Sequence, residues 1–460
     1  MRILVSTVVL ALTLHGSSGR APLPEPADAP VGTAAPARAA RTGLVHLDGR
    51  AVADDGGPFD AVGASLFWLA WGYKFDRTRL EANLQTLADA GVDYVRALGD
   101  VGPDGWTDRT IDPAWPDYDA VIAGATDLAY DRYGLRVEWT IFGGSRHVPT
   151  PEARRRLVDR VAAMARARPE KIFAIEVANE SWQNGFEGDA GRREVRALGA
   201  RLKGAVRNLV ALSAPPNDSG AACALYAGSA ADIMTLHYDR DTSRGPWAPV
   251  WQPWAWPDAD IGPGACAARL PSAVFNNEPI GPEASVNADG DPLRIAAAIV
   301  TTFLAGNAAY VLHTGAGVRG GGAEDRALGR AANFVNVPEA HAIFGAIAAA
   351  KRYLPPDLPN WTRHDVASET AFRGITEALA QGHLARAGFA ERGPEILGVL
   401  LGITGDVVLH PQIAMTVDVI DPLTGAVAQR VDAEPGADIR LSRPSRTTGD
   451  AWVVRAHKKR

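Results

Sequence analysis

Residues 172–180 read Ile-Phe-Ala-Ile-Glu-Val-Ala-Asn-Glu, a largely apolar run that ends in two polar residues. A short, nearly continuous apolar run is typical of a strand in a parallel sheet that is covered on both faces. Seven further runs of this kind occur along the chain, with helical stretches between them. The eight strands are predicted at residues 62–68, 92–97, 135–141, 172–179, 208–212, 233–237, 273–278 and 309–313.

Eight strand–helix units over roughly 300 residues predict an α/β fold of the (β/α)8 barrel type. Helix starts support the alternation, because Thr150 and Asp291 stand directly before Pro151 and Pro292 and are favourable N-caps. An open doubly wound sheet is the structural alternative. No glycine-rich dinucleotide fingerprint follows the first strand, which argues against that alternative.

The chain divides into four parts by composition. Residues 1–20 carry Arg2 and then a short apolar run, which predicts a signal peptide and a secreted or periplasmic protein. Residues 21–43 form a linker rich in Ala and Pro. The barrel is expected at 44–355, and the β-rich remainder at 356–460 predicts a small antiparallel accessory domain. Residues 421–425 within it, Asp-Pro-Leu-Thr-Gly, predict a turn.

Composition excludes some partners and suggests another. The net charge of −6 gives no reason to expect nucleic acid or a membrane surface as a partner. The 12 Trp residues favour carbohydrate, since flat sugar faces stack on aromatic rings. Trp68, Trp139 and Trp182 lie on or directly after predicted strands and are expected to contact a sugar substrate. The Trp residues at 247–256 are interleaved with prolines that argue against a helix, and both packing and sugar binding remain open for them.

Two cysteines, Cys223 and Cys266, form a disulfide in an oxidising compartment or remain two buried thiols. The sequence leaves both readings open, because it does not give the separation of their Cα atoms.

In a (β/α)8 barrel the catalytic side chains stand at the C-terminal ends of the strands. Glu180 ends the fourth predicted strand and Glu278 ends the seventh, 98 residues further along the chain. Those strands lie nearly opposite each other across the barrel mouth. A pair of carboxyl groups is what cleavage of a glycosidic bond requires, since one protonates the leaving oxygen and the other attacks the anomeric carbon. The sequence therefore predicts Glu180 as acid/base and Glu278 as nucleophile, roughly 5–5.5 Å apart.

Neighbouring strand ends supply side chains suited to this chemistry. Arg96 is expected to hold Glu278 ionised, and Tyr238 to donate a hydrogen bond to Glu278. Asn179 and His237 are expected to bind the substrate, Asn179 through the sugar 2-hydroxyl group. Glu180 needs a raised pKa to act as an acid near neutral pH.

These motifs resemble those of clan A retaining glycoside hydrolases, a group that includes cellulase- and mannanase-like barrels. Residues 175–181, Ile-Glu-Val-Ala-Asn-Glu-Ser, are similar to the group's strand-four Asn-Glu signature, and residues 274–279, Val-Phe-Asn-Asn-Glu-Pro, to its strand-seven nucleophile motif. Arg96 and the His237–Tyr238 pair are similar to its strand-two arginine and its strand-six His and aromatic pair. The resemblance implies the same two roles for Glu180 and Glu278.

The chain departs from the group at two places. Several members carry a Trp at the end of strand eight, whereas this chain has Leu312-His313-Thr314. A single residue separates the strand-six His from the Tyr in cellulase-like members, whereas His237 and Tyr238 are adjacent. The β-rich tail resembles the accessory domains attached to many such barrels.

Two other functions are compatible with the sequence. One is a carbohydrate-binding barrel without catalysis, which the presence of both glutamates argues against. The other is a metal-dependent barrel hydrolase with His237, Asp239 and Asp241 as ligands, which Arg240 among the acids argues against. The prediction is a glycosidase that needs no metal and no cofactor.

Overall fold

The computed structural model describes residues 41–102, 109–216, 219–259, 266–282, 289–319, 338–364, 366, 371–441 and 450–459. The predicted signal peptide and nearly all of the predicted linker lie outside these residues.

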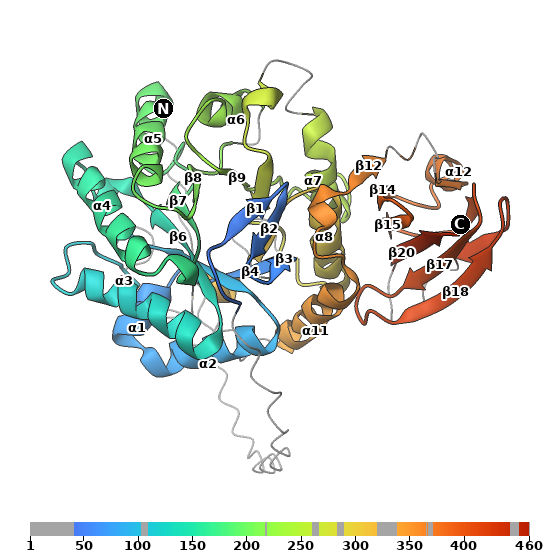
Figure 1. The fold of residues 1–460 in the computed structure, drawn as a ribbon, viewed down its shortest axis with the longest axis horizontal. Helices are drawn as coiled ribbons and strands as arrows, with labels where there is room; N and C mark the ends of the chain where they lie inside the picture. Colours follow the sequence, from blue (N-terminus) through green and yellow to red (C-terminus); the bar gives the residue numbers. More distant parts are fainter. Residues whose placement is uncertain are drawn as a thin grey trace, which may run out of the picture. The chain divides into compact units, whose positions relative to one another are not determined.

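Eight parallel strands form the central sheet, and all eight strands predicted from the sequence are present (Figure 1). They are β4 Ala61–Ser65, β5 Tyr94–Leu98, β6 Arg136–Phe142, β7 Ile172–Ala178, β8 Leu209–Ala211, β9 Ile233–Leu236, β10 Ala273–Asn276 and β11 Ala309–Leu312. Their order is β8-β7-β6-β5-β4-β11-β10-β9, so the last strand returns to pair with the first. Among the described residues no ladder joins β8 to β9, and the barrel is nearly closed. The predicted (β/α)8 fold is confirmed.

Helices cover the outside of this sheet (Figure 1). They are α1 Leu69–Phe75, α2 Arg77–Asp89, α3 Tyr118–Asp127, α4 Pro151–Ala167, α5 Gly188–Lys203, α6 Ser219–Tyr226, α7 Ala248–Ala259, α8 Pro292–Leu304, α9 Gly315–Arg319 and α11 Pro338–Tyr353. Single short turns of 3₁₀ or π type occur at η1 Leu128–Arg132, η2 Ser145–His147, η3 Pro169–Lys171, η4 Ala267–Arg269 and η5 Leu358–Asn360. Both predicted N-caps form, since Thr150 accepts a hydrogen bond from the Ala153 amide and Asp291 from the Leu293 amide. Of the described helices, none combines the length and the apolar character that crossing a bilayer requires.

Apolar side chains close the N-terminal end of the barrel. A three-stranded sheet, β1 His46–Asp48, β2 Ala51–Asp54 and β3 Gly57–Pro58, precedes the first barrel strand and supplies Val52 to this cluster. Tyr94 and Phe173 stack inside the barrel with ring centroids 3.7 Å apart, and Phe59 meets Phe173 edge-on. This apolar cluster packs the N-terminal end of the barrel, opposite the strand ends at which Glu180 and Glu278 were predicted.

The tryptophan-rich segment after β9 is a helix, α7, which corrects the prediction that its prolines exclude one. Pro249 lies in the first turn, where an amide has no intrahelical acceptor, and Trp254 within the helix is 8% exposed. The rings of Trp251 and Trp254 stack at 5.3 Å, and a Cβ added at Gly388 would lie 3.0 Å from both. These two residues therefore pack against β14, Arg386–Arg392, of the C-terminal antiparallel part. The side chain of Trp256 lies outside the described residues.

The C-terminal part is antiparallel and β-rich, as predicted, and it forms two sheets. Strands of the larger sheet are labelled in Figure 1. The strand orders of the two sheets are β12-β14-β15-β20-β17-β18 and β13-β16-β19. The elements are β12 Thr362–His364, β13 Phe372–Arg373, α12 Ile375–Ala380, β14 Arg386–Arg392, β15 Glu395–Leu401, β16 Val407–Pro411, β17 Met415–Ile420, β18 Val427–Ala433, β19 Ile439–Leu441 and β20 Ala451–Lys458. The predicted turn joins β17 to β18, and the Gly425 amide donates to the Asp421 carbonyl within it.

Cys223 and Cys266 form a disulfide, with their Cα atoms 6.0 Å apart. The bridge ties α6 to the segment before η4, and it settles the alternative that the sequence left open.

Candidate active site

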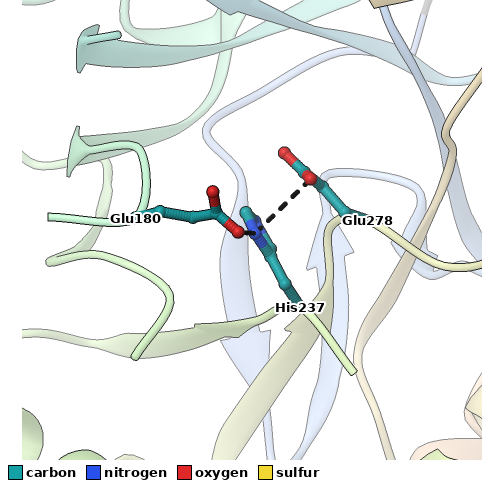
Figure 2. Close-up of side chains that lie close together, drawn as sticks. All are labelled: Glu180, His237 and Glu278. Atoms are coloured by element: carbon teal, nitrogen blue, oxygen red, sulfur yellow. Dashed lines mark hydrogen bonds and ion pairs between the residues drawn. The ribbon is translucent and has the colours of Figure 1, made fainter. Parts of the chain in front are cut away.

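Two carboxylates and one imidazole meet at the C-terminal end of the barrel strands, as Figure 2 shows. Glu180 follows β7, His237 follows β9 and Glu278 follows β10. His237 Nδ1 lies 2.9 Å from Glu180 Oε1 and 3.5 Å from Glu278 Oε2. One oxygen of each glutamate and one nitrogen of His237 all lie within 4.8 Å of one another. The strand ends thus bring together two acids that are far apart in the chain.

The backbone at Glu180 is strained. Its φ is 41°, and it is the one non-glycine residue with a positive φ among those the structure describes. Adjacent hydrogen bonds hold this turn: Asn184 Nδ2 donates to the Asn179 carbonyl at 2.9 Å, and the Ser181 amide donates to Ser213 Oγ at 2.8 Å. Such strain persists only where the surrounding structure fixes it, and it clusters at functional sites.

Arg96, from β5, binds Glu278 from inside the barrel. Its Nη1 donates to Glu278 Oε1 at 2.9 Å, which is the contact expected from the sequence. Its Nη2 donates to Glu176 Oε2 and to Asn179 Oδ1, both at 2.8 Å. The guanidinium is fully buried, so these hydrogen bonds fix its orientation. Arg96 therefore links the nucleophile candidate to the strand that carries Glu180.

Two further acids lie beneath the site. Burial raises the pKa of Glu138 to about 8, against the opposing effect of Arg96. Burial thus favours the neutral form of Glu138, and Asn277 Nδ2 donates to its Oε1 at 2.7 Å. Glu176 accepts hydrogen bonds from Thr140 and Thr235 in addition to Arg96. The positive charge of Arg96 is thus shared between Glu176 and Glu278.

Cationic and imidazole groups keep Glu278 ionised. Burial by itself would raise the pKa of this carboxyl, but the nearby His237, His313, Arg96 and Arg240 hold it well below its usual range. His313 Nε2 lies 3.6 Å and Arg240 Nη2 3.8 Å from Glu278 Oε2. An ionised carboxylate is the form that a nucleophile needs.

The pKa of Glu180 differs from the value expected for a general acid. Burial raises the pKa of this carboxyl, but the hydrogen bond and charge of His237 outweigh burial, so the pKa lies below its usual value. The prediction of a raised pKa is therefore wrong for the ligand-free protein. The physical reason is the His237 imidazole, because nothing in the sequence indicates that it lies against Glu180.

Of the other predicted substrate-binding residues, Asn179 lies beside the site, whereas Tyr238 is bonded elsewhere. Asn179 is partly buried and is held by Arg96 beside the site. Tyr238 is buried and its hydroxyl donates to Asn307 Oδ1 at 2.7 Å, so the predicted hydrogen bond from Tyr238 to Glu278 is wrong. His237 and Tyr238 are adjacent, and their side chains leave the chain in different directions.

Of the three tryptophans predicted to contact sugar, one is exposed. Trp182, two residues after Glu180, is 42% exposed. Trp68 and Trp139 are each 1% exposed, with their indole N–H groups donating to the Ala316 carbonyl and to Thr126 Oγ1. The prediction of sugar contacts by these two is corrected, because both rings are core side chains packed under helices.

Four residues of the site escaped prediction: Glu138, Glu176, His313 and Arg240. A usable signal existed for Glu138 and Glu176, since an acid inside an apolar strand is costly unless it is paired. His313 stands out in the sequence only as a departure from the strand-eight Trp of similar barrels, and nothing in the sequence indicates that Arg240 turns toward Glu278.

Within the described part of the chain, Glu180, His237 and Glu278 are the one set of three side chains that could jointly hold a metal ion. Asp239 and Asp241, the ligands considered from the sequence, do not join it; Asp239 pairs with Arg244. Two guanidinium groups near Glu278 disfavour a further cation there.

Replacing Arg96 by Met is expected to destabilise the protein strongly. The change leaves Glu176 and Glu278 buried without their shared cation, and breaking a buried ion pair costs about 3–5 kcal/mol. Urea unfolding followed by circular dichroism measures this free energy. Arg430→Met is the matched control, since Arg430 pairs with Asp418 in an exposed position and its loss should leave unfolding unchanged. Equal unfolding midpoints for the two variants would contradict the structural role of Arg96.

No protein-family model matches the chain, and no curated protein sequence matches it. Two solved structures are similar to it in fold. One is a glycoside hydrolase family 5 protein from Bacteroides vulgatus, with 12% identity and a TM-score of 0.61 over 91% of this chain and 94% of that one. The other, described as a glycoside hydrolase, also has 12% identity and a TM-score of 0.61, over 91% of this chain and 97% of its own length. The chain therefore shares the fold of these glycoside hydrolases over nine-tenths of its length.

Proposed function

We propose that this protein is a secreted retaining glycoside hydrolase, with Glu278 as nucleophile and Glu180 as acid/base. The observation that carries the proposal is that an oxygen of each carboxylate lies within 4.8 Å of the other across the barrel mouth. Retaining enzymes hold their carboxyl groups about 5–5.5 Å apart, whereas inverting enzymes need about 6.5–9.5 Å to admit a water molecule. The short separation favours double displacement.

In the first step, Glu278 attacks the anomeric carbon while Glu180 gives its proton to the leaving glycosidic oxygen. Arg96 binds Glu278 Oε1 at 2.9 Å, whereas the nitrogen atoms of His237, His313 and Arg240 lie 3.5, 3.6 and 3.8 Å from Oε2. Oε2 is therefore the less tightly held oxygen and the one placed to form the covalent bond. In the second step Glu180 takes a proton from water, and the resulting hydroxide displaces Glu278 from the sugar.

The charge of Glu278 supports the change of role at Glu180. In the free protein this negative charge acts to raise the pKa of Glu180. Once Glu278 is esterified by the sugar its charge is gone, and the pKa of Glu180 falls further. Glu180 is then a base when the second step needs one. Substrate binding displaces water from around Glu180, which raises its pKa for the first step.

The substrate class and the location follow from separate observations. The fold shared with glycoside hydrolases and the exposed Trp182 beside Glu180 support a carbohydrate substrate. The disulfide supports export, because such bonds persist in oxidising compartments.

Product stereochemistry tests the mechanism. The wild type is incubated with a panel of aryl glycosides and polysaccharides, and ¹H NMR follows the first anomer released. We expect the anomeric configuration of the substrate to be retained, and activity to survive EDTA. First release of the opposite anomer would contradict double displacement, and loss of activity with EDTA would favour a metal-dependent reaction.

A further inference from the structure

We propose that His313, at the end of β11, is a positioning residue that orients the attacking oxygen of Glu278 and is itself oriented by Ser65. This inference rests on the proposed function and deepens it, because it assigns a task to the strand-eight position of the barrel.

Three buried side chains form a chain of contacts. Ser65, the last residue of β4, has its Oγ 2.9 Å from His313 Nδ1. His313 Nε2 on the other side of the ring lies 3.6 Å from Glu278 Oε2. Ser65, His313 and Glu278 are respectively 0%, 1% and 5% exposed. Among the residues that the structure describes, His313 Nε2 has no hydrogen-bond partner, and it lies on the side of the ring next to the Glu278 carboxylate.

The backbone fixes the three residues relative to each other. A Cβ at Gly281, three residues after Glu278, would lie 1.7 Å from the His313 carbonyl oxygen. A Cβ at Gly317 would lie 1.9 Å from the Ser65 carbonyl oxygen. Only glycine allows these approaches, and the Gly315 amide also donates to the Pro282 carbonyl at 3.0 Å. The segments after β4, β10 and β11 are therefore locked together around the site.

The charge of Glu278 decides which nitrogen of His313 carries the proton. A lone pair on Nε2 would face the negative carboxylate, whereas an Nε2–H group is attracted to it. Ser65 stabilises that tautomer by donating its hydroxyl proton to Nδ1. The ring then presents an N–H donor to Glu278 Oε2.

A neutral donor suits a nucleophile better than a second bound cation. Burial lowers the pKa of His313 to about 4; Glu278 opposes this effect, and Arg240, Arg96 and His237 add to it. The ring is therefore uncharged in neutral and mildly acidic solution. At 3.6 Å it directs Oε2 without forming a full hydrogen bond, so the oxygen stays free to attack.

Two substitutions at His313 separate positioning from simple packing. His313→Gln can place an amide N–H near the position of Nε2, whereas His313→Asn reaches only to the position of Nδ1 and still bonds Ser65. The substrate is a 2,4-dinitrophenyl glycoside that the wild type hydrolyses, since this leaving group needs no proton and kcat/KM then reports attack by Glu278. Thermal unfolding checks that each variant folds.

We expect His313→Asn to lose about 100-fold in kcat/KM, as when one preorganised donor is removed, and His313→Gln to keep most of the activity. The acid limb of the pH profile should move to higher pH in the Asn variant, because loss of the donor raises the pKa of Glu278. Ser65→Ala, which removes one oxygen and keeps the ring, should lose about fivefold, the equivalent of one ordinary hydrogen bond.

Wild-type rates in His313→Asn, or equal losses in the Asn and Gln variants without a shift of the acid limb, would overturn the inference while the proposed function stands. If wild type hydrolyses no member of the panel faster than Glu278→Gln does, the proposed function fails and the role of His313 fails with it.

Discussion

Glu278→Ala is expected to lower kcat by about 10⁵-fold or more, since the double displacement loses the group that forms the covalent bond. Glu278 is 5% exposed and is held by Arg96 at 2.9 Å, with three further nitrogen groups within 3.8 Å. No neighbouring carboxylate is placed to replace it, because Glu176 and Glu138 are engaged beneath the site. Steady-state hydrolysis of the best aryl glycoside measures the loss.

Adding sodium azide to the Glu278→Ala variant tests directly whether Glu278 is the nucleophile. The truncated side chain leaves room for a small anion next to Arg96, and azide there can attack the anomeric carbon directly. The expected product is a glycosyl azide of inverted configuration, formed in a single displacement. Glu377→Ala, at an exposed glutamate in α12, is the control and should retain wild-type rates without azide. Full activity in Glu278→Ala would rule out the assigned nucleophile.

Glu180→Gln is expected to separate substrates by their leaving groups. General acid catalysis contributes about 10²–10⁴-fold, so alkyl and sugar leaving groups should slow by that factor. A 2,4-dinitrophenyl glycoside needs no protonation, and its kcat/KM should change far less. The basic limb of the pH profile should also disappear, because activity falls with rising pH when Glu180 loses its proton and a glutamine has none to lose.

Glu187→Gln is the matched control for this variant. Glu187 lies seven residues further on the same rim, is largely exposed and pairs with Arg146 rather than with His237. The Glu187→Gln variant should leave both the leaving-group dependence and the basic limb of the pH profile unchanged. A loss in Glu180→Gln that is equal for all leaving groups, with the basic limb retained, would contradict its role as the acid.

The barrel was predictable because its signal is repeated. Each strand is a short apolar run, and eight of them alternate with helices, so an error in one boundary does not affect the rest. The first strand was predicted at 62–68 but ends at Ser65, since residues 69–75 already belong to α1. In the C-terminal part the signal is weaker for β14, because Arg386–Arg392 has small residues and charged ends rather than β-branched side chains.

Predictions from local sequence failed where long-range contacts decided the structure. The prolines of α7 make the segment a poor isolated helix, yet in the folded protein it is helical and Trp254 is buried against the C-terminal sheet. The disulfide was undecidable for a related reason, since its formation depends on a Cα separation that arises only when α6 and the segment before η4 come together.

The sequence by itself determined that the chain forms a barrel and that Glu180 and Glu278 stand at strand ends facing one mouth, because strand ends follow from the apolar periodicity. It did not determine which side chains face inward, since both faces of a barrel strand are buried and equally apolar. Glu138 contacts Asn277 inside the barrel, whereas its neighbour Trp139 contacts Thr126 of α3 outside. Only the tertiary structure placed His237 against Glu180 and His313 against Glu278, because protonation depends on distances of a few ångströms between groups far apart in the chain.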